Sequence, residues 1–168
     1  MKYILETERL ALREFTVNDS EFIIELVNSP DWIKFIGDRK IKTDVEAKAY
    51  IENGPIKSYR ENGFGLSLVE IKTDGTKIGM CGIIKRHHLD NPDIGFAFLP
   101  QFTGKGFAFE IANATLTYAT TKLNLPKISA ITIAANIKSI RLIEKIGMTY
   151  IKTFCFPNNT EELLLYNN

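Results

Sequence analysis

The most informative segment of the chain is residues 93–116, which read DIGFAFLPQFTGKGFAFEIANATL. Its first part, Ile94 to Leu99, is apolar almost throughout, as expected for a strand covered on both faces. Pro100 ends that strand because proline cannot donate a backbone hydrogen bond. Beyond the glycines, apolar residues recur at helical spacing, which predicts a helix beginning at about Gly104–Gly106. The segment therefore predicts a strand, a tight glycine-rich loop and a helix.

The loop places Lys105 between two glycines, Gly104 and Gly106. Glycine lets the backbone turn tightly with its N–H groups pointing outward. Free N–H groups at the positive end of a helix suit an anion such as a diphosphate. The alternative is that both glycines serve only the geometry of the turn. A dinucleotide fingerprint would need a third glycine at Phe109, and a P-loop would need one at Leu99, so neither motif fits.

Four short motifs are spread over residues 7–148. They are Thr7-Glu8-Arg9-Leu10-x-Leu12-Arg13, Ile78-Gly79-x-x-Gly82, Gln101-x-x-Gly104-x-Gly106, and Asn136-x-x-Ser139 followed by Glu144-Lys145-x-Gly147. In residue type and order these motifs resemble those of the GCN5-related N-acetyltransferases (GNAT). The likeness is to the RimJ/RimL-like branch, which includes ribosomal-protein N-terminal acetyltransferases.

Composition narrows the class of protein. The length of 168 residues suits one domain, here residues 1–168 as a single N-acetyltransferase domain. A formal net charge of +1 gives no reason to expect binding to nucleic acid or to an anionic membrane. No stretch approaches the ~20 apolar residues of a membrane span. Cys81 and Cys155 both lie in apolar, strand-like runs, and we interpret them as reduced core thiols of a cytoplasmic protein.

The remaining patterns predict an α+β fold, with a mixed, mostly antiparallel twisted sheet of about six or seven strands and about four helices. The resemblance adds a splayed central strand pair. Helices are predicted from Asn18–Ser20 and from Thr43 or Asp44, the second interrupted at Gly54–Pro55, and Asn28-Ser29-Pro30 should end the first. The expected strands are residues 8–15, 64–71, 77–86, 94–99, 127–134, 148–156 and 161–166.

Two further groups of residues allow alternative interpretations. Trp32, Ile33, Phe35 and Ile36 lie in a predicted connector, and they line a substrate mouth or plug the core under a loop. The His87–His88 pair invites a metal site, but the sequence holds no third His, and carboxylates would have to complete the ligand set. We expect no metal, and a histidine near the site would more readily carry a proton.

The resemblance implies acetyl-coenzyme A as cosubstrate, bound where two strands splay apart. Its pantetheine arm would pair with the edge of the strand at Phe96–Leu99, and its diphosphate would lie on the N–H groups of residues 103–108. Asn136 would bond to the pantetheine or the acceptor, a role compatible with that of a helix N-cap. The expected cofactor-binding residues are Phe96, Phe98, Leu99, Gln101, Thr103, Gly104, Lys105, Gly106, Phe107, Ala108 and Asn136.

The implied reaction is direct attack of a neutral primary amine on the thioester in a ternary complex. The acceptor would be a peptide N-terminus or a small-molecule amine. Asp93 is the preferred general base, with Glu70 as second choice, and a backbone N–H near Phe98 or Leu99 would stabilise the oxyanion. Many family members carry a Tyr at the position of Ile143 as general acid, and the branch pattern gives that task to Ser139. A hydroxyl is a much weaker acid than a thiol, so Ser139 would donate a hydrogen bond rather than its proton.

The departure at position 143 leaves one alternative function open, a coenzyme-A-binding sensor or assembly module without turnover. The sequence does not distinguish a monomer from a homodimer, although the exposed edges of the terminal hairpin would suit a dimer.

Overall fold

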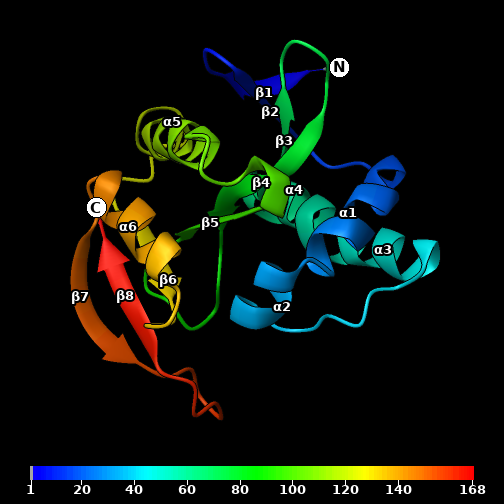
Figure 1. The fold of residues 1–168 in the computed structure, drawn as a ribbon. Helices are drawn as coiled ribbons and strands as arrows, with labels where there is room; N and C mark the ends of the chain where they lie inside the picture. Colours follow the sequence, from blue (N-terminus) through cyan, green and yellow to red (C-terminus); the bar gives the residue numbers. More distant parts are fainter. Residues whose placement is uncertain (1) are drawn as a thin grey trace.

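The computed structural model describes residues 2–168, which form one eight-stranded sheet with helices on both faces (Figure 1). The strand order is β1-β2-β3-β4-β5-β6-β8-β7, and all neighbours are antiparallel except the parallel pair β5–β6. The strands are β1 (Tyr3–Glu6), β2 (Leu10–Arg13), β3 (Leu66–Ile71), β4 (Lys77–Ile84), β5 (Asp93–Phe98), β6 (Ser129–Thr132), β7 (Thr149–Phe154) and β8 (Leu163–Asn167). The predicted α+β class with a mixed, mostly antiparallel sheet is confirmed.

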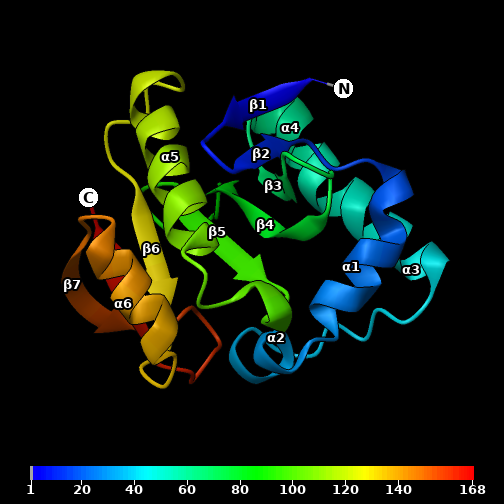
Figure 2. The same cartoon turned by 45° about the horizontal axis from the view of Figure 1, so that its top comes forward.

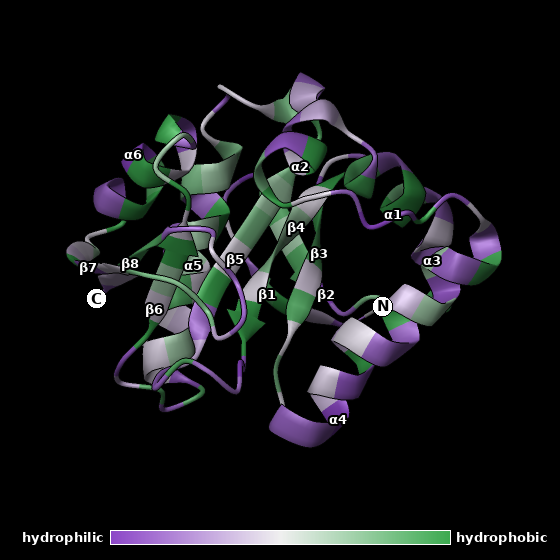
Figure 3. Ribbon diagram, turned by 90° about the horizontal axis from the view of Figure 1, so that it is seen from below, coloured by the Kyte–Doolittle hydropathy of each residue, from purple (hydrophilic) through white to green (hydrophobic). Residues whose placement is uncertain are grey.

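The helices divide between the two faces of the sheet. They are α1 (Ser20–Val27), α2 (Pro30–Phe35), α3 (Asp44–Ile51), α4 (Lys57–Asn62), α5 (Phe107–Thr121) and α6 (Ile137–Lys145), with shorter turns η1 (Val17–Asp19), η2 (Glu52–Ile56) and η3 (Pro100–Phe102). One buried cluster joins α5 and α6 to the sheet through residues such as Ile111 and Ile143. Figure 2 shows these two helices lying over β5 and β6. A second cluster joins the α1–α4 region to residues such as Leu68 and Met80. Figure 3 shows the apolar strands between the two helical layers.

The sheet has one strand more than predicted. Strand β1 pairs with β2 at the sheet edge. Its residues, Tyr-Ile-Leu-Glu, do not alternate between apolar and polar, and they are half-buried or exposed, so the sequence lacks the pattern that marks a strand. The alternation of Leu10 and Leu12 with Ala11 and Arg13 predicts a half-buried strand, yet all four residues of β2 are buried, including Arg13. A partner for that guanidinium must therefore come from elsewhere in the chain.

Pro30 ends α1 as predicted, but it also begins a helix. Ser29 is the N-cap of α2 and Pro30 occupies its first turn, where the missing N–H costs nothing because no intrahelical acceptor would meet it. The predicted connector at residues 31–36 is therefore largely helical. Trp32 is buried in the cluster beneath α1–α4, whereas Ile33 and Ile36 remain exposed. Trp32 thus plugs the core, and its exposed neighbours remain free for a partner molecule.

The helix expected near residues 43–62 is confirmed, and at Gly54–Pro55 its α-helical pattern is interrupted by a π-helical turn while the helical path continues. The Thr43 side chain accepts a hydrogen bond from the Glu46 N–H in a capping box, and a π-helical turn at η2 carries Gly54 and Pro55. Because α3, η2 and α4 follow one another directly, they count as one helical unit. Together with α1, α2, α5 and α6 the described residues thus form five units, where about four were expected. Among residues 2–168, none of these helices is both long and apolar enough to cross a membrane.

The two cysteines occupy different environments, so the prediction that both are core thiols is wrong for one of them. Cys81 is fully buried, and burial raises the pKa of its thiol to about 12. Cys155 is exposed just after the end of β7.

We expect one thiol of the native protein to react within minutes with an aromatic disulfide reagent, and both to react in denaturant. A Cys155→Ser variant should lose the fast reaction; a native Cys155→Ser protein that still reacts quickly would contradict this assignment.

Candidate active site

The parallel strands β5 and β6 meet at one end and separate at the other. Their pairing is confined to Asp93 and Ser129, where the Ser129 N–H also donates to the Pro92 carbonyl at 2.8 Å. On its other side β5 pairs with β4 from Asp93 to Phe98. Among residues 2–168, the edge of β5 beyond Asp93 therefore carries backbone groups without a strand partner, as expected for the splayed pair.

The hydrogen-bond pattern identifies which amides face this gap. The Leu99 N–H donates to the Ile78 carbonyl at 3.0 Å, on the β4 side. In an antiparallel pair alternate residues bond to the same neighbour, so the backbone groups of Ala97 also face β4, while those of Phe96 and Phe98 face the gap. The Leu99 amide is thus already used, and Phe98 is left as the candidate oxyanion donor.

The loop after β5 supplies further free amides. Gly104 and Gly106 adopt φ angles of 74° and 81°, a region that residues with a Cβ enter only with strain. Within residues 2–168, the amides of 104–108 have no hydrogen-bond acceptor, whereas the Thr103 amide bonds to the Pro100 carbonyl at 3.2 Å. The amides that remain available to a candidate anion site are therefore those of residues 104–108, without Thr103. Because Gly106 is the N-cap of α5, the helix dipole adds to the positive potential there.

The side chains around the loop lie at its rim. Gln101 and Lys105 are exposed; the Gln101 amide contacts Glu25 at 3.5 Å, and the Lys105 ammonium lies 5.5 Å from the centre of the Phe102 ring. Phe107 and Ala108 are half-buried at the start of α5. Lys105 therefore offers an exposed positive charge to an anion bound on the amides.

On the other side of the gap, β6 is followed by the start of α6. Because β5 and β6 are parallel, the residues that follow them, Gly104–Gly106 and Asn136–Ser139, lie at the same edge of the sheet. The Asn136 side chain accepts a hydrogen bond from the Ser139 N–H at 3.2 Å, so its N-cap role is confirmed. Ile143 is 1% exposed and packs in the core, so it offers no polar group to the gap, and Ser139 in the first turn of α6 remains the candidate hydroxyl.

The preferred base lies at the closed end of the gap. Asp93 is 1% exposed, and its Oδ1 accepts a hydrogen bond from Arg86 Nε at 2.8 Å. Burial raises the pKa of the Asp93 carboxyl above its usual range, and Arg86 offsets part of that rise. Side chains alternate between the two faces of a strand, so Asp93 lies on the same face of β5 as Ala97. That face packs against the α1–α4 cluster.

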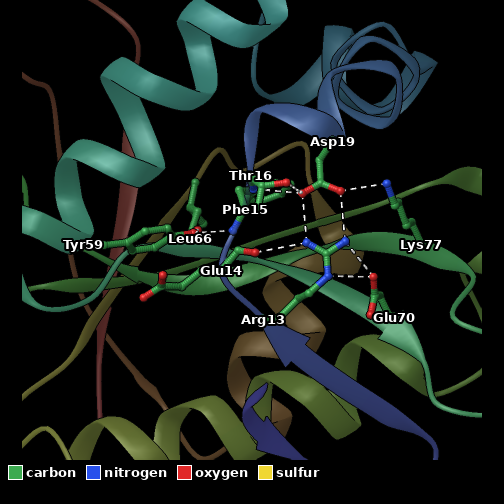
Figure 4. Close-up of polar contacts among 9 residues, drawn as sticks. All are labelled: Arg13, Glu14, Phe15, Thr16, Asp19, Tyr59, Leu66, Glu70 and Lys77. Carbon is green, nitrogen blue, oxygen red and sulfur yellow. Dashed lines mark hydrogen bonds and ion pairs between the residues drawn. The ribbon is translucent and has the colours of Figure 1, made fainter. Parts of the chain in front are cut away.

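The second-choice base, Glu70, belongs to a buried ion cluster away from the gap (Figure 4). Its carboxylate bonds to Arg13, which also makes two hydrogen bonds of 2.9 Å to Asp19, and Lys77 approaches Asp19 at 2.7 Å. Although burial alone would raise it, the pKa of Asp19 is held well below its usual range by hydrogen bonds from Arg13, Lys77 and the Thr16 amide. Glu70 lies on β3, which β4 separates from β5. The structure therefore brings Asp93, but not Glu70, to the diverging strands.

The local residue pattern did not reveal this cluster, because a charged residue that ends an alternating strand reads as solvent-facing. Arg13, the last residue of β2, is instead buried; burial would lower its pKa, but Asp19 and Glu70 outweigh that effect and raise it.

The paired histidines, His87 and His88, lie exposed in the loop before β5. Over residues 2–168, no group of three or more His, Cys, Asp or Glu side chains is arranged to hold a metal ion.

Comparison with known proteins agrees with this geometry. The family model for the acetyltransferase (GNAT) domain matches residues 9–149. The chain is 30% identical to the uncharacterized N-acetyltransferase YnaD of Bacillus subtilis over 159 residues, covering 94% of this chain and 90% of that protein. It resembles a GNAT-family acetyltransferase from Bacillus anthracis with a TM-score of 0.81 and 27% identity, covering 98% and 96% of the two chains.

The fold is also that of RimL, a ribosomal L7/L12 alpha-N-protein acetyltransferase solved in complex with coenzyme A. That likeness has a TM-score of 0.85 at 12% identity and covers 99% of this chain and 97% of the other. The splayed strands, the free loop amides and the family match lead to one conclusion: the chain belongs to the GNAT family, with a RimJ/RimL-like fold, and is an acetyl-coenzyme-A-dependent N-acetyltransferase.

Proposed function

We propose that residues 1–168 act as one domain that transfers an acetyl group to a primary amine by direct attack within a ternary complex. The observation that carries this proposal is the unpaired edge of β5 beside the free amides of the following loop. The pantetheine arm pairs with the backbone of Phe96 and Phe98 as an added strand would, and the diphosphate binds the amides of residues 104–108. In this proposal the arm runs from the loop along Phe98 and then Phe96, so its thioester end points toward Asp93, and a gap-facing N–H of β5 stabilises the oxyanion.

The acceptor in this proposal is a peptide N-terminus or a small-molecule amine with an apolar group beside the amine. Asp31 of α2 and Lys138 of α6 approach within 3.6 Å, so these two helices meet at the open edge of the gap. Three exposed apolar side chains lie on the same two segments, namely Ile33, Ile36 and Ile137. An amine with a pKa near 8, such as an N-terminus, is already partly neutral at pH 7 and needs only a weak base.

Asp93 is the proposed base, acting directly or through water, and Ser139 is the proposed hydrogen-bond donor to the leaving thiolate. Support for Asp93 comes from its raised pKa and from its position on β5, on the face that packs against α1–α4. Support for Ser139 comes from its place in the first turn of α6, where Asn136 fixes its backbone.

The test is release of free thiol from acetyl-coenzyme A over a panel of N-terminal peptides, amino acids, aminoglycosides and polyamines. We expect turnover with the first two classes, and a fall in kcat of roughly 100-fold for both Asp93→Asn and Ser139→Ala. Coenzyme A affinity, measured by calorimetry, should change little. The acidic limb of the wild-type pH–rate profile should disappear in Asp93→Asn.

Asp90→Asn is the matched control, because it removes an exposed carboxylate from the loop that precedes Asp93 and β5. It should keep wild-type kcat. Coenzyme A binding without turnover across the whole panel would favour the sensor or assembly alternative. Unchanged kcat in both site variants would reject the roles given to Asp93 and Ser139.

A further inference from the structure

A carboxylate lies in the first turn of α5, close to the amides proposed to bind a diphosphate. Glu110 is four residues beyond Gly106, and its amide donates to the Gly106 carbonyl at 3.0 Å. An uncompensated negative charge there would repel the phosphates of the coenzyme. The segment between β1 and β2 neutralises it, because Arg9 Nε lies 2.7 Å from Glu110 Oε2.

The same carboxylate is held by two more donors. Glu110 Oε1 accepts hydrogen bonds from the Thr7 hydroxyl at 2.6 Å and from the Arg9 N–H at 2.9 Å. Although partial burial would raise it, these donors lower the pKa of Glu110 below its usual range. The carboxylate is therefore ionised and fixed in direction, facing the β1–β2 connection.

Arg9 also contacts the loop itself. Its Nη1 donates to the Lys105 carbonyl at 3.1 Å, and its guanidinium lies 4.5 Å from the centre of the Phe107 ring. Its Nη2 would lie 3.3 Å from a Cβ added to Gly106. One side chain thus touches three consecutive residues at the turn.

The contact with the Lys105 carbonyl determines where the next amide points. In a planar trans peptide the C=O and the following N–H point in opposite directions. Because Arg9 draws the Lys105 carbonyl toward the β1–β2 connection, the Gly106 N–H is turned away from it. That orientation matches an anion on the outer side of the loop.

We propose that Arg9 and Glu110 form a lock on the diphosphate loop: Arg9 orients the Gly106 amide and cancels the charge of Glu110, so that the loop is ordered before the coenzyme binds. Arg9 is a positioning residue, and this role rests on the proposed function of the loop. Pre-ordering increases affinity because binding then costs less conformational entropy. The motif Thr7-Glu8-Arg9-Leu10 is thereby assigned to coenzyme binding.

The test is a double-mutant cycle on the full chain, with coenzyme A affinity measured by calorimetry. Arg9→Met should weaken binding at least tenfold, because it frees the loop and exposes the Glu110 charge. Glu110→Gln should weaken binding about twofold to threefold. The Arg9→Met/Glu110→Gln pair should bind more tightly than Arg9→Met alone, since the repulsive charge is gone. Arg9→Lys should fall between wild type and Arg9→Met, because it keeps the charge but loses the fork of donors.

Three further readouts separate the lock from a general effect on folding. The KM for acetyl-coenzyme A should rise in Arg9→Met while the KM for the amine stays unchanged. The Tm should fall by no more than about 2–4 °C, since the Arg9 side chain is 44% exposed. Lys48→Met is the matched control, because it removes one cation from an exposed ion pair with Asp44; its coenzyme affinity should match wild type.

The outcomes distinguish the lock from the proposed function. A wild-type protein that does not bind coenzyme A would reject the function of the loop itself. Wild-type binding with equal affinity in Arg9→Met would reject the lock alone. Measurement with 3′-dephospho-coenzyme A should show the same Arg9→Met loss; a loss that vanishes without the 3′-phosphate would mean that Arg9 contacts that phosphate directly, and would overturn the positioning role.

Discussion

Replacing Ala108 with Asp should weaken coenzyme A binding roughly 100-fold while leaving the protein folded. Ala108 is the second residue of α5 and is half-buried beside the free amides that begin at Gly104. An acidic side chain in the first turn of a helix is favourable for the helix itself. It would, however, place a negative charge about 6 Å from a bound diphosphate, a repulsion of roughly 2–3 kcal/mol at an effective dielectric constant near 20.

Ala108→Asn is the matched control for this substitution, because it adds the same volume without the charge. We expect its coenzyme affinity to stay within a few-fold of wild type, and the difference between the two variants to shrink as salt is added. Calorimetry gives the affinities and thermal unfolding shows that both variants fold. Equal affinity in the Asp and Asn variants would mean that the diphosphate binds elsewhere.

Replacing Arg13 with Met should lower the free energy of unfolding by about 3–5 kcal/mol at pH 7. The guanidinium is 3% exposed and is the shared partner of Asp19 and Glu70, so its removal leaves two buried carboxylates without their main compensating charge. Lys77 still reaches Asp19, but its side chain is 35% exposed and it makes no ion pair with Glu70 among the described residues. Urea unfolding measures the loss directly.

Two variants test the cause of that loss. Lys48→Met breaks an exposed ion pair and should change stability by at most about 0.5 kcal/mol. Arg13→Met/Asp19→Asn/Glu70→Gln removes all three charges and should be more stable than Arg13→Met alone. If the triple variant is no more stable than the single one, lost packing rather than unpaired charge causes the effect.

The same cluster predicts a pH dependence. The folded-state pKa of Asp19 is lowered, so its contribution to stability is present above the unfolded-state pKa of about 3.9 and is lost as the pH falls below it. In Arg13→Met the carboxylate has lost its main partner and gains less from being ionised. The stability gap between wild type and Arg13→Met should therefore narrow between pH 5 and pH 3.

Much of the fold was predictable because local chemistry and tertiary packing agree. The strand–loop–helix at residues 93–116, the helix start at Thr43–Asp44 and the irregular helical turn at Gly54–Pro55 all appear where the sequence indicated. The candidate anion site was predictable for the same reason, since glycines at positive φ before a helix leave amides free whatever surrounds them. Strand β1 was missed because a short edge strand of half-exposed residues has no distinctive pattern.

The candidate site also shows where sequence reasoning stops. Both Leu99 and Phe98 were candidates for the oxyanion donor, and only the register of β5 against β4 shows that the Leu99 amide is used by Ile78. Thr103 was expected among the diphosphate amides, but η3 uses its N–H within the turn. Hydrogen-bond register is a property of paired strands and turns, so it cannot be obtained from residue types alone.

The sequence by itself determined the order of the elements, the glycine-rich loop and the family, because these depend on residues close together in the chain. The tertiary structure alone decided which charges meet. Asp19 reads as a helix cap, but its side chain bonds to Arg13, and Arg9 reads as an exposed strand residue, but it holds Glu110 across 101 positions of sequence. The physical reason is that an ion pair depends on distance in space: the connection between β1 and β2 brings Thr7 and Arg9 to the first turn of α5, and no local pattern records that approach.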